Sequence, residues 1–266
     1  MNHEDTDGLN RAKRVLEKQQ EAQRKHEEAF PMLEALAIEA AVWNEFNLIE
    51  FNKPETQREL MAMGWASVVI RQSHVTIAGS NTAMSDSVMP NLRTAFEHAV
   101  YVSLLARSDF NSAALDRLDA KLLKTVTDAV QSISISGFEE LNDIESLFPP
   151  GRVPLRRPED EWIGKMEQVC NLFSNDENLY LIYKGLSSSV HPSVQSCLPY
   201  IMDFFKSDGQ QFAHAPQGVF VSVMVGTALA TNVWTLSALN KILRTDYLAP
   251  HLPTMAKIAK VSVELK

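Results

Sequence analysis

The residues with the clearest chemical potential lie between Tyr183 and His191. Tyr183, Ser187 and His191 follow one another at a spacing of four, which places them on one face of an α-helix. Pro192 comes next and ends the helix, because proline donates no backbone hydrogen bond and restricts the residue before it. A histidine at a helix terminus can exchange a proton near neutral pH. This row is therefore a candidate functional site.

A second polar row lies earlier in the chain, on a helix that apolar periodicity predicts over residues 87–107. Arg93, Glu97 and Tyr101 are again four residues apart, directly beside the apolar stripe of this helix. An arginine and a glutamate inside a core are strongly disfavoured unless they are paired and hydrogen-bonded. The row is therefore either half-exposed or part of an internal polar network.

If the two helices pack together, their polar rows converge, and Glu97 can accept hydrogen bonds from Arg93, Tyr183 or His191. In a functional interpretation, His191 is a general acid or base, and Arg93 or Lys184 stabilises an anion such as phosphate. In a structural interpretation, the same residues form a buried network that fixes the helix register. Both interpretations use one set of candidate residues. These are His191, Arg93, Glu97, Lys184, Tyr183 and Ser187.

Most known site motifs are absent from the sequence. It has no G-x-G-x-x-G or G-x-x-x-x-G-K run, no H-E-x-x-H, and no histidine three residues after an acidic residue as in di-iron bundles. We therefore expect neither a cofactor nor a metal site. A hydrolase that uses Ser187 and His191 is a weaker alternative. No G-x-S-x-G surrounds the serine, and residues four apart on one helix rarely supply an oxyanion hole as well.

Composition favours a cytoplasmic helical protein. Only 10 of the 266 residues are glycine, and long segments carry helical spacing without turn signals. A formal net charge of -8 argues against broad nucleic-acid binding but leaves a local basic patch open. The two cysteines lack CxxC spacing, and the acidic N-terminus lacks the pattern of a secretion signal. The expected fold is an all-α, multi-helix bundle.

The periodicity divides the chain into two regions. Residues 1–30 are expected to form a long polar helical arm, either solvated or in contact with another subunit, and residues 31–266 a helical-bundle domain. No charged residue lies between Asp208 and Lys241, but frequent Ser, Thr and Asn favour a buried central helix over a membrane helix. Helices are predicted over 32–51, 54–78, 87–107, 110–135, 162–173, 194–206, 219–243 and 254–264, with a basic, proline-rich loop at 148–158.

The two rows resemble a widespread family of bacterial all-helical proteins of unknown function. The resemblance rests on Leu92-Arg-Thr-Ala-Phe-Glu-His-Ala-Val-Tyr101 and on Tyr183-Lys-Gly-Leu-Ser-Ser-Ser-Val-His-Pro-Ser193, within residues 60–245. That family is similar to the HEPN group, which comprises helical bundles of toxin–antitoxin and phage-defence systems. Many HEPN proteins are dimeric, metal-independent RNases.

The resemblance implies a homo-oligomeric protein of prokaryotic defence or stress response, with an RNA or protein partner and an RNase site built on His191 with Arg93 or Lys184. The HEPN motif is an arginine, four to six residues, then a histidine. Counting back from His191, those arginine positions hold Lys184, Gly185 and Leu186. Lys184 keeps the positive charge but lacks the guanidinium fork. The alternative is a non-catalytic interaction module whose polar network is structural.

Overall fold

Every regular element in the structure is a helix. The computed structural model describes residues 24–80, 85–110, 164–173, 179–191 and 221–265, together with a few single positions before residue 24. No strand occurs in these ranges. The predicted all-α bundle is therefore confirmed for the described part of the chain. The predicted helices 110–135 and 194–206, the loop 148–158 and most of the arm lie outside it.

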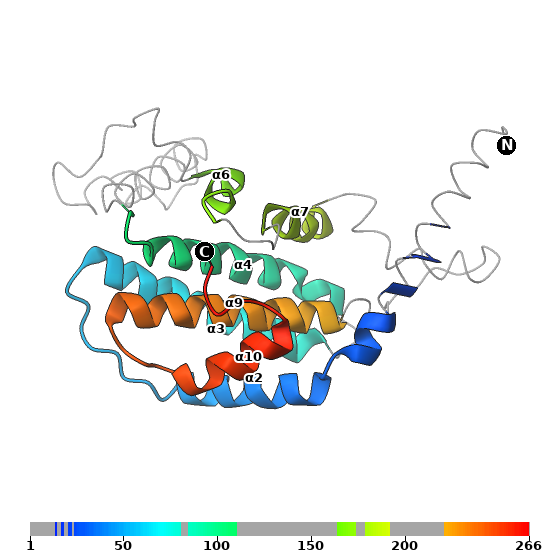
Figure 1. The fold of residues 1–266 in the computed structure, drawn as a ribbon, viewed down its shortest axis with the longest axis horizontal. Coiled ribbons are helices and arrows are strands. Elements are labelled where there is room, and N and C mark those ends of the chain that lie inside the picture. The colour runs from blue at the N-terminus through cyan, green and yellow to red at the C-terminus, as the bar shows by residue number, and fades with distance from the viewer. Residues whose placement is uncertain are drawn as a thin grey trace, which may run out of the picture.

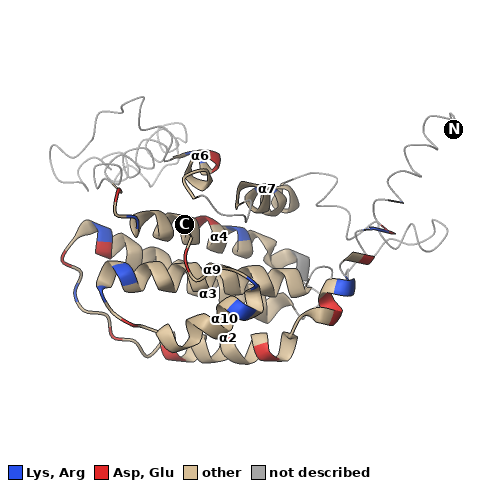
Figure 2. Ribbon diagram, viewed as in Figure 1, with Lys and Arg blue, Asp and Glu red and all other residues tan. Residues whose placement is uncertain are grey.

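Three long helices form the centre of the bundle and pack against one another (Figure 1). They are α3 (Gln57–Ser80), α4 (Met89–Leu105) and α9 (Val221–Leu243). α9 is buried along almost its whole length, because no Asp, Glu, Lys or Arg precedes Lys241 in it. Figure 2 shows the charged residues mainly at helix ends and in loops, with the middle of α9 free of them.

α9 has the length and composition of a membrane helix but the surroundings of a core helix. Among the described helices it is the one long and apolar enough to cross a bilayer, yet 78% of its most apolar stretch is buried inside the bundle. Its polar residues are buried too. The hydroxyl oxygens of Thr231 and Ser73 lie 3.1 Å apart and join α9 to α3. Within the described part, Asn232 Oδ1 and Thr235 Oγ1 have no hydrogen-bond partner.

Shorter helices cover two sides of this centre (Figure 1). α2 (Met32–Phe46) and α10 (Leu252–Ala259) pack together and against α9. α6 (Met166–Cys170) and α7 (Leu179–Val190) pack against α4. The short 3-10 helices η1 (Ser85–Val88) and η4 (Ala249–His251) lead into α4 and α10. α7 therefore brings the second polar row to the helix that carries the first.

The start of α3 is fixed by a capping box that the prediction from Pro54 missed. The Thr56 hydroxyl accepts a hydrogen bond from the Glu59 amide at 3.2 Å, and the Glu59 carboxylate accepts one from the Thr56 amide at 3.1 Å. This reciprocal pair is the Thr-x-x-Glu signature of a helix start. The helix consequently begins at Gln57 rather than at Pro54.

Three other predicted helices differ in length from those observed. The predicted helix 32–51 ends at Phe46, where the Asn47 side chain bonds the Trp43 carbonyl. The predicted helix 162–173 is only the short α6 in its described part. The predicted helix 254–264 is α10, which begins earlier and ends at Ala259 because Lys260 adopts a left-handed conformation.

The end of the N-terminal arm contacts α9. Residues 24–29 are helical, and His26 Nδ1 lies 2.9 Å from Ser222 Oγ. The Phe30 ring is buried, and a Cβ atom at Gly226 would lie 3.3 Å from it. A glycine at this position of α9 therefore lets the aromatic ring approach the helix backbone closely.

α9 and α10 both end in a backbone turn that normally contains glycine. The amide of Thr245 bonds the Asn240 carbonyl at 3.0 Å, and the amide of Val261 bonds the Ala256 carbonyl at 3.0 Å. These bonds span five residues, as in a Schellman motif. The left-handed residues inside them are Arg244 (φ 53°) and Lys260 (φ 56°). A side chain in this conformation brings Cβ close to the following carbonyl oxygen, at a cost of about 1 kcal/mol.

We expect Lys260→Gly to raise the free energy of unfolding by about 1 kcal/mol, because glycine removes this clash. The matched control is Lys257→Gly, in the last turn of the same helix, which should lower stability by about 1 kcal/mol through helix propensity. Chemical denaturation of both variants measures the difference. Loss of stability in both variants would contradict the conclusion that Lys260 is strained by its left-handed conformation.

Candidate functional site

The two polar rows meet at the guanidinium group of Arg93. Its Nε donates to Glu97 Oε1 at 3.0 Å on the same helix. Its Nη2 donates to the Tyr183 hydroxyl at 3.3 Å, and its Nη1 lies 3.1 Å from His191 Nε2. The structure thus brings together four of the predicted residues and makes Arg93, rather than Glu97, their common partner.

Apolar packing orients both rows. On α4, the buried side chains of Leu92, Phe96 and Val100 face the bundle centre, so Arg93 and Glu97 lie at the edge of that face. On α7, the buried residues are Leu179 and Leu186. The Tyr183 ring packs beside them against the same core.

The last described turn of α7 positions the histidine. The His191 amide bonds the Ser187 carbonyl at 3.1 Å, which completes the helical hydrogen bonds, and Pro192 follows in the sequence. The imidazole is exposed at this helix end. His191 is therefore held at its backbone by α7 and at its ring by α4.

The charge of Arg93 is fixed by its partners. The Arg93 and Glu97 side chains are only 22% and 28% exposed. Burial alone would lower the pKa of the Arg93 guanidinium, but Glu97 and Tyr183 outweigh it, and the pKa is raised. The guanidinium therefore stays protonated and acts only as a hydrogen-bond donor.

This donor role defines the state of His191. Because Arg93 Nη1 can only donate, the His191 Nε2 atom, 3.1 Å away, must be the acceptor. This hydrogen bond forms only with a neutral imidazole that carries its proton on Nδ1. An imidazolium could not accept this bond and would face a second positive charge. In this arrangement the nitrogen that could act as a base is already occupied.

Aromatic stacking extends the network along α7. The Arg93 guanidinium lies 5.5 Å from the centre of the Tyr183 ring, and that ring stacks on Tyr180 at 6.1 Å with an interplanar angle of 22°. The Lys184 ammonium lies 5.6 Å from the centre of the Tyr180 ring. Cations and rings are mutually attracted in this geometry. Through this stacking, Tyr180 and Tyr183 become part of the contact between α4 and α7.

Two predicted site residues do not join the Arg93 network. Lys184 is exposed over Tyr180, and within the described part it makes no ion pair or hydrogen bond with the other candidates. Ser187 contributes its carbonyl to the helix, and no hydrogen bond between its hydroxyl and the His191 ring occurs among the described residues. This arrangement offers no support for a hydrolase built on Ser187 and His191.

Tyr101, the third residue of the first row, lies among other aromatic and ionisable groups. Its ring centre is 5.7 Å from that of Trp65. Burial, followed by the charge of Glu97 and the neighbouring Cys170 and Tyr183, raises the pKa of Tyr101 to about 12. The phenol is therefore neutral across the physiological range.

A second, partly buried acid–base pair was not predicted from the sequence. Glu39 Oε1 of α2 lies 2.6 Å from His74 Nδ1 of α3, and the His74 ring is stacked on Trp43 with centres 4.0 Å apart. The sequence did contain one signal, because Glu39 falls in line with the buried Ala35 and Val42 of α2. A glutamate on an apolar stripe requires a partner.

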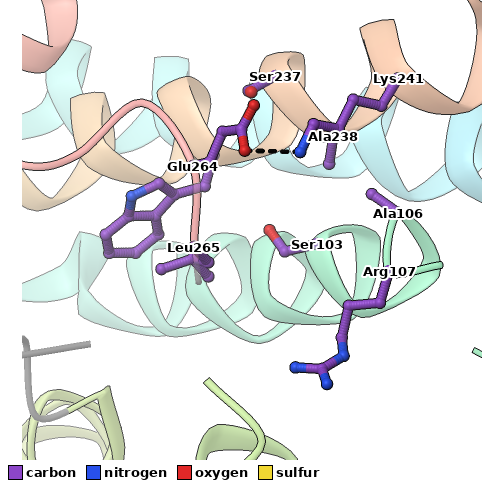
Figure 3. A pocket seen from close by; sticks show the side chains of 9 residues that line it. Ser103, Ala106, Arg107, Ser237, Ala238, Lys241, Glu264 and Leu265 are labelled. Atoms are coloured by element: carbon purple, nitrogen blue, oxygen red, sulfur yellow. Dashed lines mark hydrogen bonds and ion pairs between the residues drawn. The ribbon is translucent and has the colours of Figure 1, made fainter. Parts of the chain in front are cut away.

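A small cavity lies between the ends of α4 and α9 under the C-terminal tail (Figure 3). Its volume is about 60 Å³, enough for about two water molecules. Its cations are already paired: Lys241 Nζ lies 2.6 Å from Glu264 Oε2, and Arg107 Nη2 lies 2.8 Å from Asp109 Oδ2. The Trp234 indole donates to the Ser262 carbonyl at 3.2 Å. The residues that line the cavity thus pair within the fold and attach the C-terminal tail to α9.

Metal-ligating residues do not cluster in the described ranges. No group of three His, Cys, Asp or Glu side chains there could hold a metal ion. The Arg93 network contains one carboxylate and one imidazole, with a guanidinium between them. These groups can donate and accept hydrogen bonds.

We expect Arg93→Lys to lower the free energy of unfolding by about 2 kcal/mol, because an ammonium cannot replace the fork that bonds three partners. Lys184→Met is the matched control on α7, where loss of an exposed charge should change stability by less than about 0.5 kcal/mol. Urea denaturation measures both. Similar effects of the two substitutions would show that Arg93 does not hold α7.

Alkaline pH should destabilise the protein partly through Tyr101. Its raised pKa means that the folded state binds the phenolic proton more tightly, so this stabilisation is lost as pH rises towards about 12. Above about pH 10, where an ordinary tyrosine ionises, we expect wild type to lose about 1 kcal/mol per pH unit more than Tyr101→Phe. Denaturant titrations at several pH values test this. Parallel curves for the two proteins would refute it.

Comparison with known proteins identifies no relative. No protein-family model matches the chain, and neither a curated protein nor a solved structure shows significant similarity to it. The similarity to HEPN proteins therefore rests only on the residues of the two sequence motifs. The function is consequently argued from the geometry of the Arg93 network.

Proposed function

We propose that the protein is a HEPN-like helical protein of prokaryotic defence or stress response, in which Arg93 and His191 form a metal-independent RNase site. The observation that carries the proposal is the 3.1 Å approach of Arg93 Nη1 to the exposed His191 ring. Positions 184–186 of the histidine's own helix supply no arginine. α4 supplies the guanidinium instead, so Arg93 rather than Lys184 is the partner of His191.

Catalysis requires the Arg93–His191 hydrogen bond to open. A backbone phosphate of RNA attracts the guanidinium of Arg93. The Arg93 N–H groups then donate to the phosphate instead of to the imidazole of His191. The freed Nε2 can then accept the proton of the 2′-hydroxyl. The 2′-oxygen forms a bond to phosphorus while the bond to the 5′-oxygen breaks, and the leaving oxygen takes a proton from the imidazolium. Arg93 stabilises the charge on the phosphorane oxygens, and the products are a 2′,3′-cyclic phosphate and a 5′-hydroxyl.

A second candidate function is a non-catalytic interaction module with a structural polar network. The observation that favours it is the use of all three guanidinium nitrogens of Arg93 within the fold, on Glu97, Tyr183 and His191. Through these three bonds the guanidinium joins α4 to the end of α7 without any ligand. In this case the helical surface binds a protein partner, and His191 attaches the end of α7 to α4 through its bond with Arg93.

RNA cleavage in the presence of a chelator separates the two functions. The RNase proposal predicts that wild-type protein cleaves single-stranded RNA and that His191→Ala lowers the rate by at least about 100-fold, the scale of a lost general base. Lys184→Ala is the matched control and should retain activity. End-group analysis should detect the cyclic phosphate. Circular dichroism spectra establish that each variant is folded.

The opposite outcome supports the interaction module. Absence of cleavage by wild type, or equal cleavage by wild type and His191→Ala, removes the RNase proposal. The module predicts that His191→Ala lowers the melting temperature by about 2–4 °C, the effect of losing about 1 kcal/mol in a chain of this size. An unchanged melting temperature would count against a structural role of His191.

A further inference from the structure

Glu39 is the one carboxylate of the described residues that lies in the buried core. Its side chain is 7% exposed and lies on the face of α2 that also carries the buried Ala35, Val42 and Phe46. A buried carboxylate without a positive or protonated partner is strongly unfavourable. The docking of α2 therefore depends on what neutralises Glu39.

That partner is His74 of α3, which is held between two side chains of α2. Its Nδ1 lies 2.6 Å from Glu39 Oε1, and its ring is parallel to the Trp43 indole within 7° at 4.0 Å. An imidazolium gains from both neighbours, through charge pairing with the carboxylate and through cation–π attraction to the indole. A neutral imidazole keeps the hydrogen bond but leaves the buried negative charge uncompensated.

A second pair of the same kind ties the other end of α2. Glu45 Oε2 lies 2.8 Å from His251 Nε2 at the junction of η4 and α10. The Glu45 side chain is 53% exposed, so water screens this pair and its contribution is smaller.

Among the described residues, no Lys or Arg replaces the protonated His74 as the positive partner of Glu39. α3 carries Arg71 near His74, and α10 carries Lys257, but both are exposed and neither forms an ion pair with Glu39 among the described residues. α9 brings no charged side chain to α2 before Lys241, which is paired with Glu264. Glu34, the remaining charged residue of α2, is acidic and exposed.

We propose that α2 is a proton-dependent latch, docked on the bundle while the Glu39–His74 pair holds its proton and loosened when the pair loses it at higher pH. Loosening would give access to the apolar stripe of α2 at Ala35, Val42 and Phe46. The proposal does not depend on RNase activity. The latch residues lie on α2 and α3, whereas Arg93 lies on α4 and His191 directly follows α7.

The pKa of the Glu39 carboxyl is shifted in the direction that the proposed latch requires. Burial raises the pKa of the Glu39 carboxyl, and the hydrogen bond and charge of His74 only partly oppose the shift. A raised pKa means that the docked state binds the proton more tightly than the undocked state. The stabilisation of the docked state by this proton is therefore complete at acidic pH, and it is lost as pH rises through the raised pKa of Glu39.

Hydrogen–deuterium exchange of the full chain tests the latch. Exchange of α2 amides is corrected for the intrinsic effect of pH and compared with that of α4 amides. From about pH 5 to about pH 9 we expect exchange of the wild-type α2 amides, relative to that of the α4 amides, to become about tenfold faster as local opening of α2 gains population. Glu39→Gln should abolish this dependence, because the amide keeps the hydrogen bond without ionising. Glu34→Gln on the exposed face is the matched control and should behave as wild type.

Each alternative result decides against the latch. A constant α2-to-α4 ratio in wild type across the pH range overturns it without reference to any variant. A pH dependence that persists in Glu39→Gln shows that another group controls α2. Should Glu39→Gln fold poorly, the wild-type series still decides, because a constant α2-to-α4 ratio overturns the latch.

Discussion

The need to cover an uncharged helix organises this bundle. α9 has no charged residue before Lys241, so each of its faces must be buried by another element. α3 and α4 supply most of that cover, and α10 and α2 supply the rest. Because the inner face of α4 is committed to α9, its flank is left at the bundle edge. That is where Arg93 can meet α7, so the geometry of the candidate site follows from the packing of the core.

Arg93 couples this site to the position of α7. The helix buries only Leu179 and Leu186 as fully covered side chains. The guanidinium bonds to Tyr183 and His191, and the stacked tyrosines add to the same contact. The attachment of α7 and the proposed chemistry therefore depend on the same atoms. A ligand that competes for Arg93 also weakens the attachment of α7, so binding and local movement are linked.

Hydrophobic periodicity and polar spacing predicted the helical class, the central helix and the two rows that converge. The spacing of four places Arg93 and Glu97 on one face, but it does not say which helix lies opposite or which atom is the shared partner. Glu39 illustrates the same limit. Its place on an apolar stripe indicates a need for compensation, yet His74 is 35 residues away and joins it only through tertiary packing. Helix ends such as Lys260 depend on left-handed backbone conformations that a lysine rarely adopts.

The chain order of the central helices has a consequence for synthesis. Ser73 on α3 and Thr231 on α9 form a direct contact across 158 residues of chain. A ribosome releases the chain from its N-terminus, so α3 and α4 emerge long before their main covering helix exists. Their apolar faces must remain soluble, or be shielded by a chaperone, until α9 is complete. Native packing of this core therefore waits for α9, the most C-terminal of its three long central helices.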